Sequence, residues 1–583
     1  MATAEEGTAA AATAGGTIPA EDIKPYKIHV SSRYLDLTKQ KLEITRLPHE
    51  LSEPKSEDWW EPKQQVEPLI DFWLEDYSWR TQEEELNTSL PQFRTGFTNP
   101  QSEAPIRVHF IHIPSSHSNA LPLLLIPSFP FTNLSFGHIL KSFTEPEDAA
   151  TNQPFHVVIP SVPGVGFSDA LPNNIPVIST TGEMFNSLMS RLNYPRYLVT
   201  NVGSGSASPA EIDWQLASYL VTEHPDSCLG AHFISPPLAQ PKLQEAPLEW
   251  AKWSIASFFQ VPILGYQSED FSALERSRPP KKSKKPSAPA QFGLNQLGLR
   301  EPNTLAYALC DSPTGLLVFA LKSLRLLAPK RDFTPTDIIT FTQLAWLPGP
   351  EAAMRYWAHC LQHPESFAKK LPSRPKIAIT VFLGDEPVEV TAQGGETGEP
   401  APASSPTVLE DKDGYACPSW ANSRYNVVYA RRAAGKAGLL AWERPELIVD
   451  GIRGLAKEVL RLDPRLRQAV APATAPLERV VSGDDGAGDP VGSGAATTMA
   501  SPEPIVQPPT PGTEEVLSPI STEDGLLAPI PEERVQPHRE ISDETRVASD
   551  TEETEMALKA KSDDTLVTAS PDTLRIDSPL PAP

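Results

Sequence analysis

A serine beside a glycine turn is the first residue whose type and position could support nucleophilic chemistry. Ser204 follows Gly203, shortly after the apolar run 196–201. A hydroxyl presented on such a turn can attack an electrophilic carbon when a histidine removes its proton. The local order Val-Gly-Ser-Gly-Ser departs from the Gly-x-Ser-x-Gly pattern of serine hydrolases, and no histidine occurs between His363 and His538. The sequence therefore offers Ser204 only as a poor nucleophile.

Metal and disulfide chemistry are not indicated by the cysteines. The chain contains four of them: Cys228, Cys310, Cys360 and Cys417. They form no Cys-x-x-Cys pair and no cluster with histidine at metal-ligand spacing, so we expect neither a bound metal nor disulfides. Unpaired cysteines are typical of a reducing compartment, which favours a cytoplasmic location. Residues 1–16 lack a signal-peptide pattern, and the apolar stretch 121–130 is too short for a bilayer, so we expect no transmembrane segment.

The composition separates an acidic tail from the rest of the chain. The 583 residues carry a formal net charge of −24, and most of that charge lies in residues 471–583. This proline-rich segment has no aromatic residue, so we predict that it is disordered. Its Ser-Pro and Thr-Pro sites are Ser501, Thr510, Ser518, Ser570 and Ser578. Phosphate there could recruit a protein partner through arginines. The rest of the chain is mildly acidic, which excludes nucleic acid as its partner.

Apolar runs of strand length alternate with helical patterns along most of the chain. The runs lie at 26–30, 107–112, 123–126, 155–159, 196–201, 376–382 and 425–429. Short apolar strands separated by helices are typical of a parallel sheet that is covered on both faces. Residues 240–370 are mostly helical and interrupt this pattern, and a last helix covers 445–462. The predicted fold class is α/β, with a helical cap.

Three further segments have a predicted structure. Residues 66–77 repeat apolar side chains at spacings of three and four, which predicts a helix packed along one face. Ser208, with a glutamate three residues later, predicts a helix over 208–224 and places Asp213 about one turn inside it, on the helix surface. The basic segment 276–285 reads as a solvated loop, with a nuclear-import signal as the alternative.

Residues 155–169 resemble the strand and turn of epoxide hydrolases with the α/β-hydrolase fold. Their order is Phe-His-Val-Val-Ile-Pro-Ser-Val-Pro-Gly-Val-Gly-Phe-Ser-Asp. The segments 73–80, 86–87 and 91–93 are similar to the N-terminal domain of the microsomal-type subfamily, 304–317 to its cap, and 443–447 to its last helix. The resemblance implies hydrolysis of an epoxide to a vicinal diol through an ester on an aspartate, without metal or cofactor. A small apolar molecule or epoxide is then the expected ligand.

The resemblance also implies the domain boundaries. We expect a disordered N-terminus at 1–19, the N-terminal epoxide hydrolase domain at 20–105, the core at 106–239 and 371–465, the cap at 240–370 with a basic linker at 267–290, an insertion at 387–413, and the tail at 466–583.

Most of the family's catalytic residues are missing when the motifs are matched position by position. Gly203 stands where the family has its attacking aspartate, and Gly438 stands where it has its catalytic histidine. The oxyanion loop contains Ser128 and Phe129 between two prolines, which alters a loop whose backbone amides must face the site. Only Asp385 falls where the family has its orienting acid.

The cap positions and the substitute nucleophiles complete the set of candidate residues. The two cap tyrosines that hydrogen-bond the epoxide oxygen are replaced by Leu294 and Trp357, with Tyr356 one residue from the second. Asp213, in an Asp-Trp pair like the family's, and Ser204 are poor substitutes for the nucleophile. His232 follows the pattern of a residue packed inside the sheet.

Loss of a nucleophile or base costs about 10⁴ to 10⁶ in kcat. We therefore predict a weakly active or inactive family member. The alternatives are a non-catalytic binding or scaffold protein with a phosphorylatable tail, and an active hydrolase whose nucleophile has migrated.

Overall fold

The computed structural model describes residues 22–50, 60, 62–203, 211–277, 301–328, 331–366, 373–384 and 415–468. The predictions for the acidic tail, the N-terminus before residue 20, the insertion 387–413 and the basic residues after 277 lie outside this part of the chain. All the described residues belong to one compact unit.

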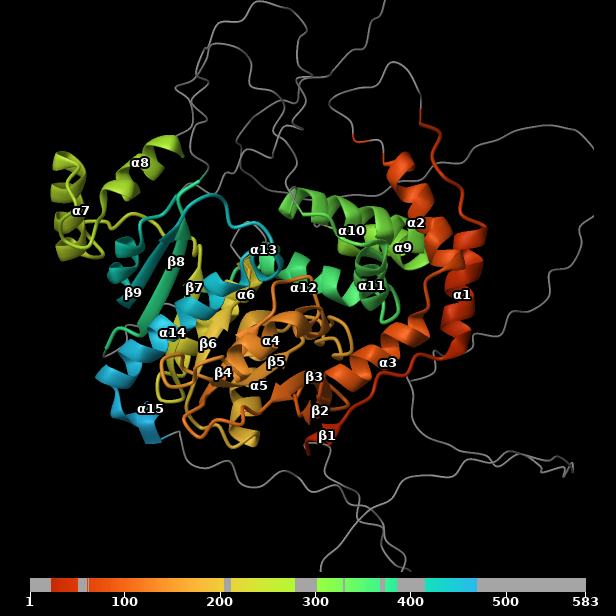
Figure 1. The fold of residues 1–583 in the computed structure, drawn as a ribbon, viewed down its shortest axis with the longest axis horizontal. Coiled ribbons are helices and arrows are strands. Elements are labelled where there is room, and N and C mark those ends of the chain that lie inside the picture. The colour runs from red at the N-terminus through yellow and green to blue at the C-terminus, as the bar shows by residue number, and fades with distance from the viewer. Residues whose placement is uncertain are drawn as a thin grey trace, which may run out of the picture. The chain divides into compact units, whose positions relative to one another are not determined.

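A sheet of nine strands forms the centre of the molecule, in the order β1-β2-β3-β5-β4-β6-β7-β8-β9 (Figure 1). The strands are β1 (Lys24–Pro25), β2 (Gln92–Phe97), β3 (Ile106–Ile113), β4 (Leu121–Ile126), β5 (Phe155–Pro160), β6 (Tyr197–Asn201), β7 (Cys228–Ile234), β8 (Lys376–Phe382) and β9 (Asn426–Ala433). From β5 to β9 every neighbouring pair is parallel, whereas β1, β2, β3 and β5 pair antiparallel. The predicted, mostly parallel α/β sheet is confirmed.

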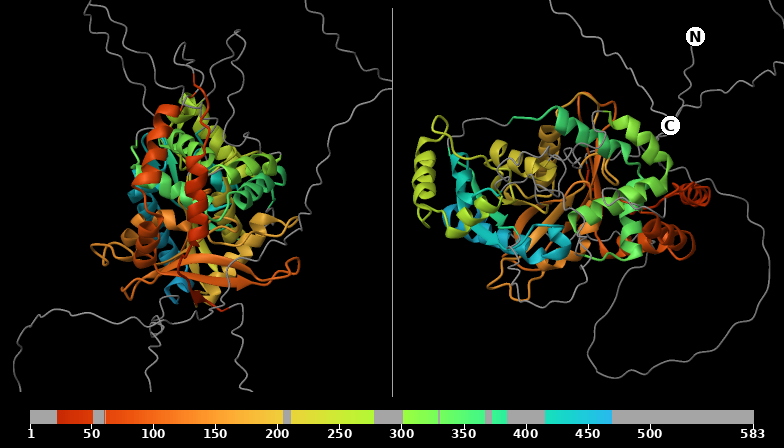
Figure 2. Two further views of the ribbon diagram at one scale, coloured as in Figure 1. Left: turned by 90° about the vertical axis from the view of Figure 1, so that its right-hand side faces the viewer. Right: turned by 90° about the horizontal axis from the view of Figure 1, so that it is seen from above.

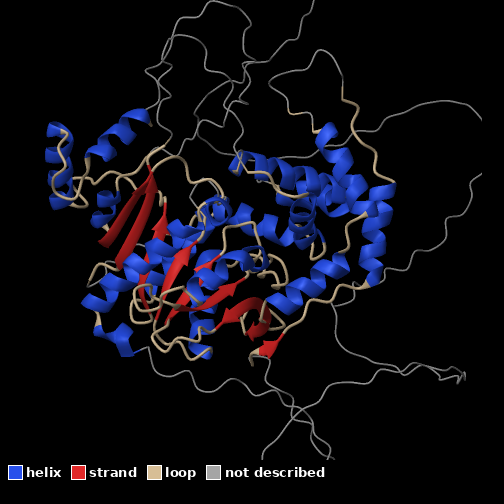
Figure 3. Cartoon of the chain, viewed as in Figure 1, coloured by secondary structure: helices blue, strands red, loops and turns tan. Residues whose placement is uncertain are grey.

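Helices cover both faces of this sheet (Figure 3). On one face lie α4 (Gly137–Thr144) and α14 (Pro445–Leu462), and on the other lie α5 (Val177–Arg191) and α6 (Ile212–Glu223). Alternate side chains of β4 point to opposite faces, as the period of a strand requires. Leu123 and Leu125 pack with α4 and α14, whereas Leu124 and Ile126 pack with α5 and α6. A strand with two buried faces explains why its sequence is continuously apolar.

The helical cap lies between β7 and β8 in the sequence, as predicted. It consists of α7 (Pro247–Phe259), α8 (Ser268–Arg276), α9 (Pro302–Asp311), α10 (Pro313–Leu327), α11 (Pro335–Trp346) and α12 (Glu351–Gln362). The predicted basic linker at 267–290 is wrong over residues 268–276. These residues form α8, whose first turn contains the acidic Glu269 and Asp270. The remaining helices near the carboxyl end are α13 (Leu440–Glu443) and α15 (Pro464–Gln468).

The N-terminal helices α1 (Ser32–Glu43) and α2 (Lys63–Glu75) lie beside the cap (Figure 2). The predicted apolar face of α2 is confirmed, since Val66 and Trp73 are buried against Leu317 of α10 and Ile339 of α11. The aromatic side chains of this segment therefore serve packing between the N-terminal part and the cap.

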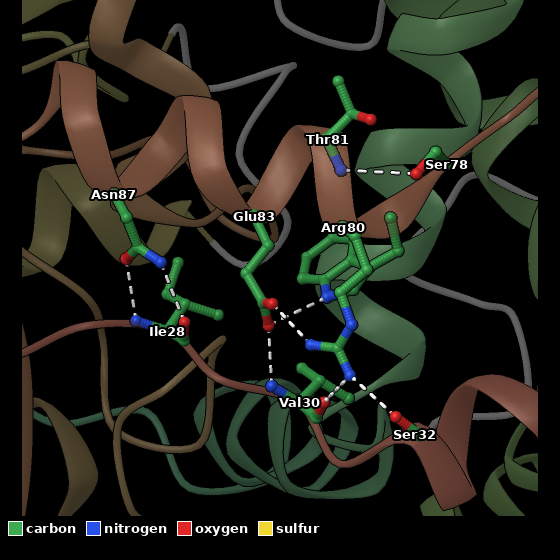
Figure 4. A network of polar contacts seen from close by, with 9 residues as sticks. Ile28, Val30, Ser32, Ser78, Arg80, Thr81, Glu83 and Asn87 are labelled. Carbon is green, nitrogen blue, oxygen red and sulfur yellow. Dashed lines mark hydrogen bonds and ion pairs between the residues drawn. The ribbon is translucent and has the colours of Figure 1, made fainter. Parts of the chain in front are cut away.

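The prediction of a strand at 26–30 is wrong, and the reason lies in α3 (Trp79–Ser89) (Figure 4). The amide of Ile28 donates to Asn87 Oδ1, and Asn87 Nδ2 donates to the carbonyl of Ile28, both at 2.8 Å. The buried Glu83 accepts from the amide of Val30 at 2.6 Å, and Arg80 donates to the carbonyl of Val30, also at 2.6 Å. Side chains of α3 thus replace a neighbouring strand. This network gives Arg80 and Asn87 of the N-terminal motif a structural role.

An Asn87→Ala substitution should lower the free energy of unfolding by about 1–3 kcal/mol, because two backbone groups of Ile28 lose their partners. Thr88→Ala is the matched control, since its hydroxyl is exposed and bonds only within its own helix. It should change stability by less than about 0.5 kcal/mol. Urea denaturation of the two variants checks this, and equal losses would contradict the role assigned to Asn87.

Within the described ranges, no single helix is long and apolar enough to cross a membrane. One pair, α9 with residues 313–325 of α10, meets the length and composition criterion when taken together and is bent by 114°.

Candidate functional site

Three segments that are distant in the sequence line one small cavity near the carboxyl ends of β4 and β6. Ser128 follows β4, Gly203 follows β6, and Gly438 precedes α13. The space between these segments is too narrow to admit a water molecule. In open α/β sheets, ligands bind outside the carboxyl ends of the strands, so this is the expected place for a site. The structure therefore brings together three of the positions that the motifs single out.

A side chain at Gly203 would require its neighbours to move. Its amide donates to Asp213 Oδ2 at 3.1 Å, and Asn201 Nδ2 donates to the carbonyl of Gly203 at 2.7 Å. A Cβ at this position would lie 2.8 Å from Asp213 Oδ2 and closer still to Ser128 Oγ. Carbon atoms do not approach oxygen so closely, so the packing around Gly203 favours glycine.

The prediction that Asp213 lies on the surface of a helix is wrong. Helix α6 begins at Ile212, and the preceding Glu211 has a left-handed backbone with φ of 53°. Ser208, the predicted cap, lies outside the described residues. Asp213 is therefore in the first turn of α6, is completely buried, and turns its carboxylate back towards the end of β6. A carboxylate in the first turn is favoured by the helix dipole. The Asp-Trp pair was the only sequence signal for this position.

Gly438 is enclosed in a similar way. Its φ of 60° lies in the left-handed region, which disfavours any residue with a Cβ. A Cβ at Gly438 would also overlap Glu443 Oε2. Each of the two glycines at the expected catalytic positions thus has a carboxylate group directly beside it. Nothing in the sequence pattern indicates Glu443 as a neighbour of this position.

The oxyanion-loop residues contact the cap positions. Phe129 is buried, stacks on Tyr356 with ring centroids 6.3 Å apart, and meets the edge of Trp357 at 6.4 Å. The Tyr356 hydroxyl lies 2.9 Å from Thr181 Oγ1 and donates to the carbonyl of Val177 at 3.3 Å. Burial raises the pKa of Tyr356 well above its usual value. Its hydroxyl is thus engaged with α5.

Ser128 differs from these neighbours in lacking a partner. Its side chain is buried, and Ser128 Oγ makes no hydrogen bond to any residue that the structure describes. This hydroxyl lies on the side of Gly203 where a Cβ would point. A buried hydroxyl without a hydrogen-bond partner lowers the stability of the folded state. Ser128 Oγ therefore carries such a cost at this site.

His232 is packed inside the sheet, as predicted. Its two ring nitrogens lie 2.9 Å from Thr200 Oγ1 and 2.9 Å from Thr380 Oγ1, on the two neighbouring strands. Burial lowers the pKa of His232 to about 3, so the imidazole is neutral at physiological pH. Because both nitrogens are bonded and the ring is fully buried, His232 is not available as a catalytic base.

The remaining candidates cannot be placed. Ser204, Leu294 and Asp385 lie outside the described residues, so their roles stay predictions. Among the residues with described positions, no group of three or more His, Cys, Asp or Glu side chains is arranged to hold a metal ion. The four cysteines are free thiols.

Comparisons with known proteins agree with the resemblance of the motifs. The family model "Epoxide hydrolase N terminus" matches residues 23–136. A putative epoxide hydrolase of Stigmatella aurantiaca is 27% identical over 376 residues, which cover 62% of this chain and 74% of that protein. Juvenile hormone epoxide hydrolase 1 of Ctenocephalides felis is 26% identical over 317 residues, 52% of this chain and 59% of that protein.

Two solved structures show the same fold. Juvenile hormone epoxide hydrolase of Bombyx mori has a TM-score of 0.54 and 21% identity, covering 76% of this chain and 96% of that one. The epoxide hydrolase of Aspergillus niger has a TM-score of 0.51 and 19% identity, covering 75% of this chain and 97% of that one. The chain therefore has the α/β-hydrolase fold and the N-terminal domain of epoxide hydrolases, and the curated relatives named above are epoxide hydrolases.

Proposed function

We propose that this chain is a degenerate epoxide hydrolase, which keeps the scaffold of the family and has lost its turnover. The observation that carries this proposal is the environment of Gly203, the position of the family's nucleophile. The space that a side chain would need there is filled by Ser128 Oγ and the Asp213 carboxylate. A small apolar molecule remains the ligand class that the family scaffold suggests.

The reaction of the family needs an attacking carboxylate, a histidine base and hydrogen-bond donors for the epoxide oxygen. The chain has glycine at the first two positions, Gly203 and Gly438. The tyrosine nearest to the third position, Tyr356, directs its hydroxyl to Thr181 and Val177. Since loss of nucleophile or base costs about 10⁴ to 10⁶ in kcat, we expect no measurable turnover.

One observation favours a second candidate, a hydrolase whose nucleophile has moved to Asp213. Its Oδ2 lies 2.8 Å from the place where the Cβ of Gly203 would be, so a carboxylate does occupy the nucleophile's region. A carboxylate there could open an epoxide and form an ester. Against this candidate, Asp213 is completely buried and the adjoining cavity has no room for the water that must cleave the ester.

Diol formation from styrene oxide or stilbene oxide decides between the two candidates. The full chain should form diol no faster than its Asp213→Asn and Ser204→Ala variants, since neither side chain works with a base. Product is measured by chromatography, and circular dichroism shows that each variant is folded. Activity that Asp213→Asn abolishes and Ser204→Ala leaves intact would establish the migrated nucleophile. Activity that only Ser204→Ala abolishes would assign the reaction to the serine. Either result overturns the degenerate function.

A further inference from the structure

A cavity with room for a small ligand lies at the amino ends of β7 and β8. Cys228 and Lys376, the first residues of these two parallel strands, both line it, and α15 contributes Arg465. We name it the amino-end cavity. Its volume of about 290 Å³ is close to the lower limit for sites that bind small organic molecules. Figure 1 shows α15 and α13, which follows Gly438, at opposite ends of the sheet, so this cavity is separate from the candidate site.

Three cationic side chains line the amino-end cavity: Arg374, Lys376 and Arg465. Lys376 and Arg465 share one carboxylate, since Asp463 Oδ2 lies 2.9 Å from Lys376 Nζ and 2.8 Å from Arg465 Nη2. The side chain of Asp463 is buried. Two positive charges therefore share one buried negative charge at the edge of this cavity.

The other carboxylates near the amino-end cavity hold its arginines less firmly. Asp226 Oδ1 lies 3.0 Å from Arg465 Nη1, but the side chain of Asp226 is 96% exposed, so this ion pair contributes little. Arg374 Nη1 lies 3.8 Å from Glu249 Oε1, which is beyond hydrogen-bond distance, and Glu249 already accepts from Lys252. Among the described residues, Arg374 therefore keeps donors for a ligand, and Asp226 is a partner that a ligand can displace from Arg465.

We propose that the amino-end cavity binds a small organic carboxylate. Guanidinium groups bind carboxylates through two parallel N–H donors. Arg465 already shows this geometry, because its Nε and Nη2 donate to the two oxygens of Asp463 at 3.0 and 2.8 Å. Ser373 adds a hydroxyl to the lining, and Val221 and Leu229 add apolar surface for the hydrocarbon part of the ligand. Such binding is independent of any catalytic turnover at the candidate site.

Titration of the full chain with benzoate, followed by saturation-transfer NMR of the ligand, tests this site. Benzoate should bind with a Kd of about 1 mM or lower. Benzamide has the same shape without the charge and should bind at least about tenfold more weakly. Arg374→Gln should weaken benzoate binding about tenfold, because a charged donor is lost. Asp226→Asn should strengthen it about two- to fivefold, because a competing carboxylate is removed from Arg465.

Arg461→Gln is the matched control, because Arg461 is an exposed arginine of α14 that pairs with Glu458 on its own helix and does not line the cavity. This variant should bind benzoate like the parent protein. The substituted side chains of Arg374, Asp226 and Arg461 are 50%, 96% and 67% exposed, so thermal unfolding should be unchanged in all three variants.

Four results would overturn the proposal of a carboxylate site. They are no saturation by benzoate at about ten times the expected Kd, equal binding of benzamide, equal effects of Arg374→Gln and Arg461→Gln, and no gain in affinity from Asp226→Asn. The gain expected from Asp226→Asn cannot arise from a loss of fold, so the two cavity variants together separate a ligand site from a structural effect.

Discussion

Replacement of Asp270 by alanine should lower the free energy of unfolding by about 3–5 kcal/mol, because it leaves a largely buried arginine without its partner. Asp270 is fully buried and accepts from Arg432 Nε at 2.7 Å and Arg432 Nη2 at 2.8 Å. It also accepts from the Tyr415 hydroxyl and from the amide of Gln267 at 2.8 Å. Burial, with Asp270 beside it, raises the pKa of Tyr415. One carboxylate thus joins α8 of the cap to β9 of the sheet.

Asp337 provides a matched control on another helix of the cap. Like Asp270, it is the third residue of its helix and accepts from the backbone amide of the capping residue, here Thr334 at 3.0 Å. Asp337 is exposed, and among the described residues its carboxylate bonds only to Thr334. Asp337→Ala should therefore cost only about 1 kcal/mol. Urea denaturation compares the two variants, and equal losses would show that the Arg432 pair adds nothing beyond the helix cap.

The sheet could be predicted from the sequence because its signal is local. The run 123–126 is apolar at every position and the run 196–201 is apolar over Tyr197 to Val199, and burial on both faces of a parallel sheet produces such continuous apolar runs. The segment 26–30 alternates apolar and polar residues, as a half-buried strand does, but it is not a strand. Its backbone groups bond to Asn87 and Glu83, more than fifty residues away, and no local pattern contains that information.

The candidate site could be predicted in part for the same reason. Short motifs identify the positions of Gly203 and Gly438, and the structure places both on one cavity. The motifs do not show which groups surround these two glycines. Asp213 lies ten residues beyond Gly203, and its orientation depends on where α6 begins, which is Ile212 and not, as the capping pattern predicts, the residue after Ser208. Long-range packing, rather than residue type, decides these details.

That packing means that restoring the family's side chains by themselves should fail. In Gly203→Asp, the new Cβ would overlap Ser128 Oγ and the new carboxylate would lie against that of Asp213. Overpacking costs about 1–3 kcal/mol, and a buried charge without a partner costs more, so this single variant should lose several kcal/mol of stability. Thermal and urea unfolding measure the loss.

The same substitution should be tolerated better when space is made for it. A triple variant with Gly203→Asp, Asp213→Ala and Ser128→Gly removes both obstacles and leaves one carboxylate. We expect the triple variant to be more stable than Gly203→Asp alone, whereas Asp213→Ala with Ser128→Gly should destabilise the parent chain, and this difference measures the coupling between the three sites. If the triple variant is less stable than the single one, the carboxylate of Asp213 is not what excludes a side chain at residue 203.

Gly438 requires a separate control, because two effects oppose a side chain there. Gly384 has a φ of 79° and nothing within 4 Å of its Cβ direction, whereas Gly438 has a φ of 60° and meets Glu443. Gly384→Ala therefore measures the cost of the left-handed backbone alone, about 1 kcal/mol. Gly438→Ala should cost more, and Glu443→Ala should recover the difference.

Reaction with an epoxide tests whether a carboxylate restored at residue 203 can act as a nucleophile. With residue 203 restored in the triple variant, an epoxide should alkylate the new carboxylate and add one ligand mass, since attack needs only a nucleophile held in place. Turnover should remain absent without a histidine base, so the adduct should persist. Intact-mass spectrometry should show no adduct on the parent protein. An adduct on the parent that disappears in Asp213→Asn would mean that the existing carboxylate already acts as the nucleophile, and the loss of function proposed for this chain would be wrong.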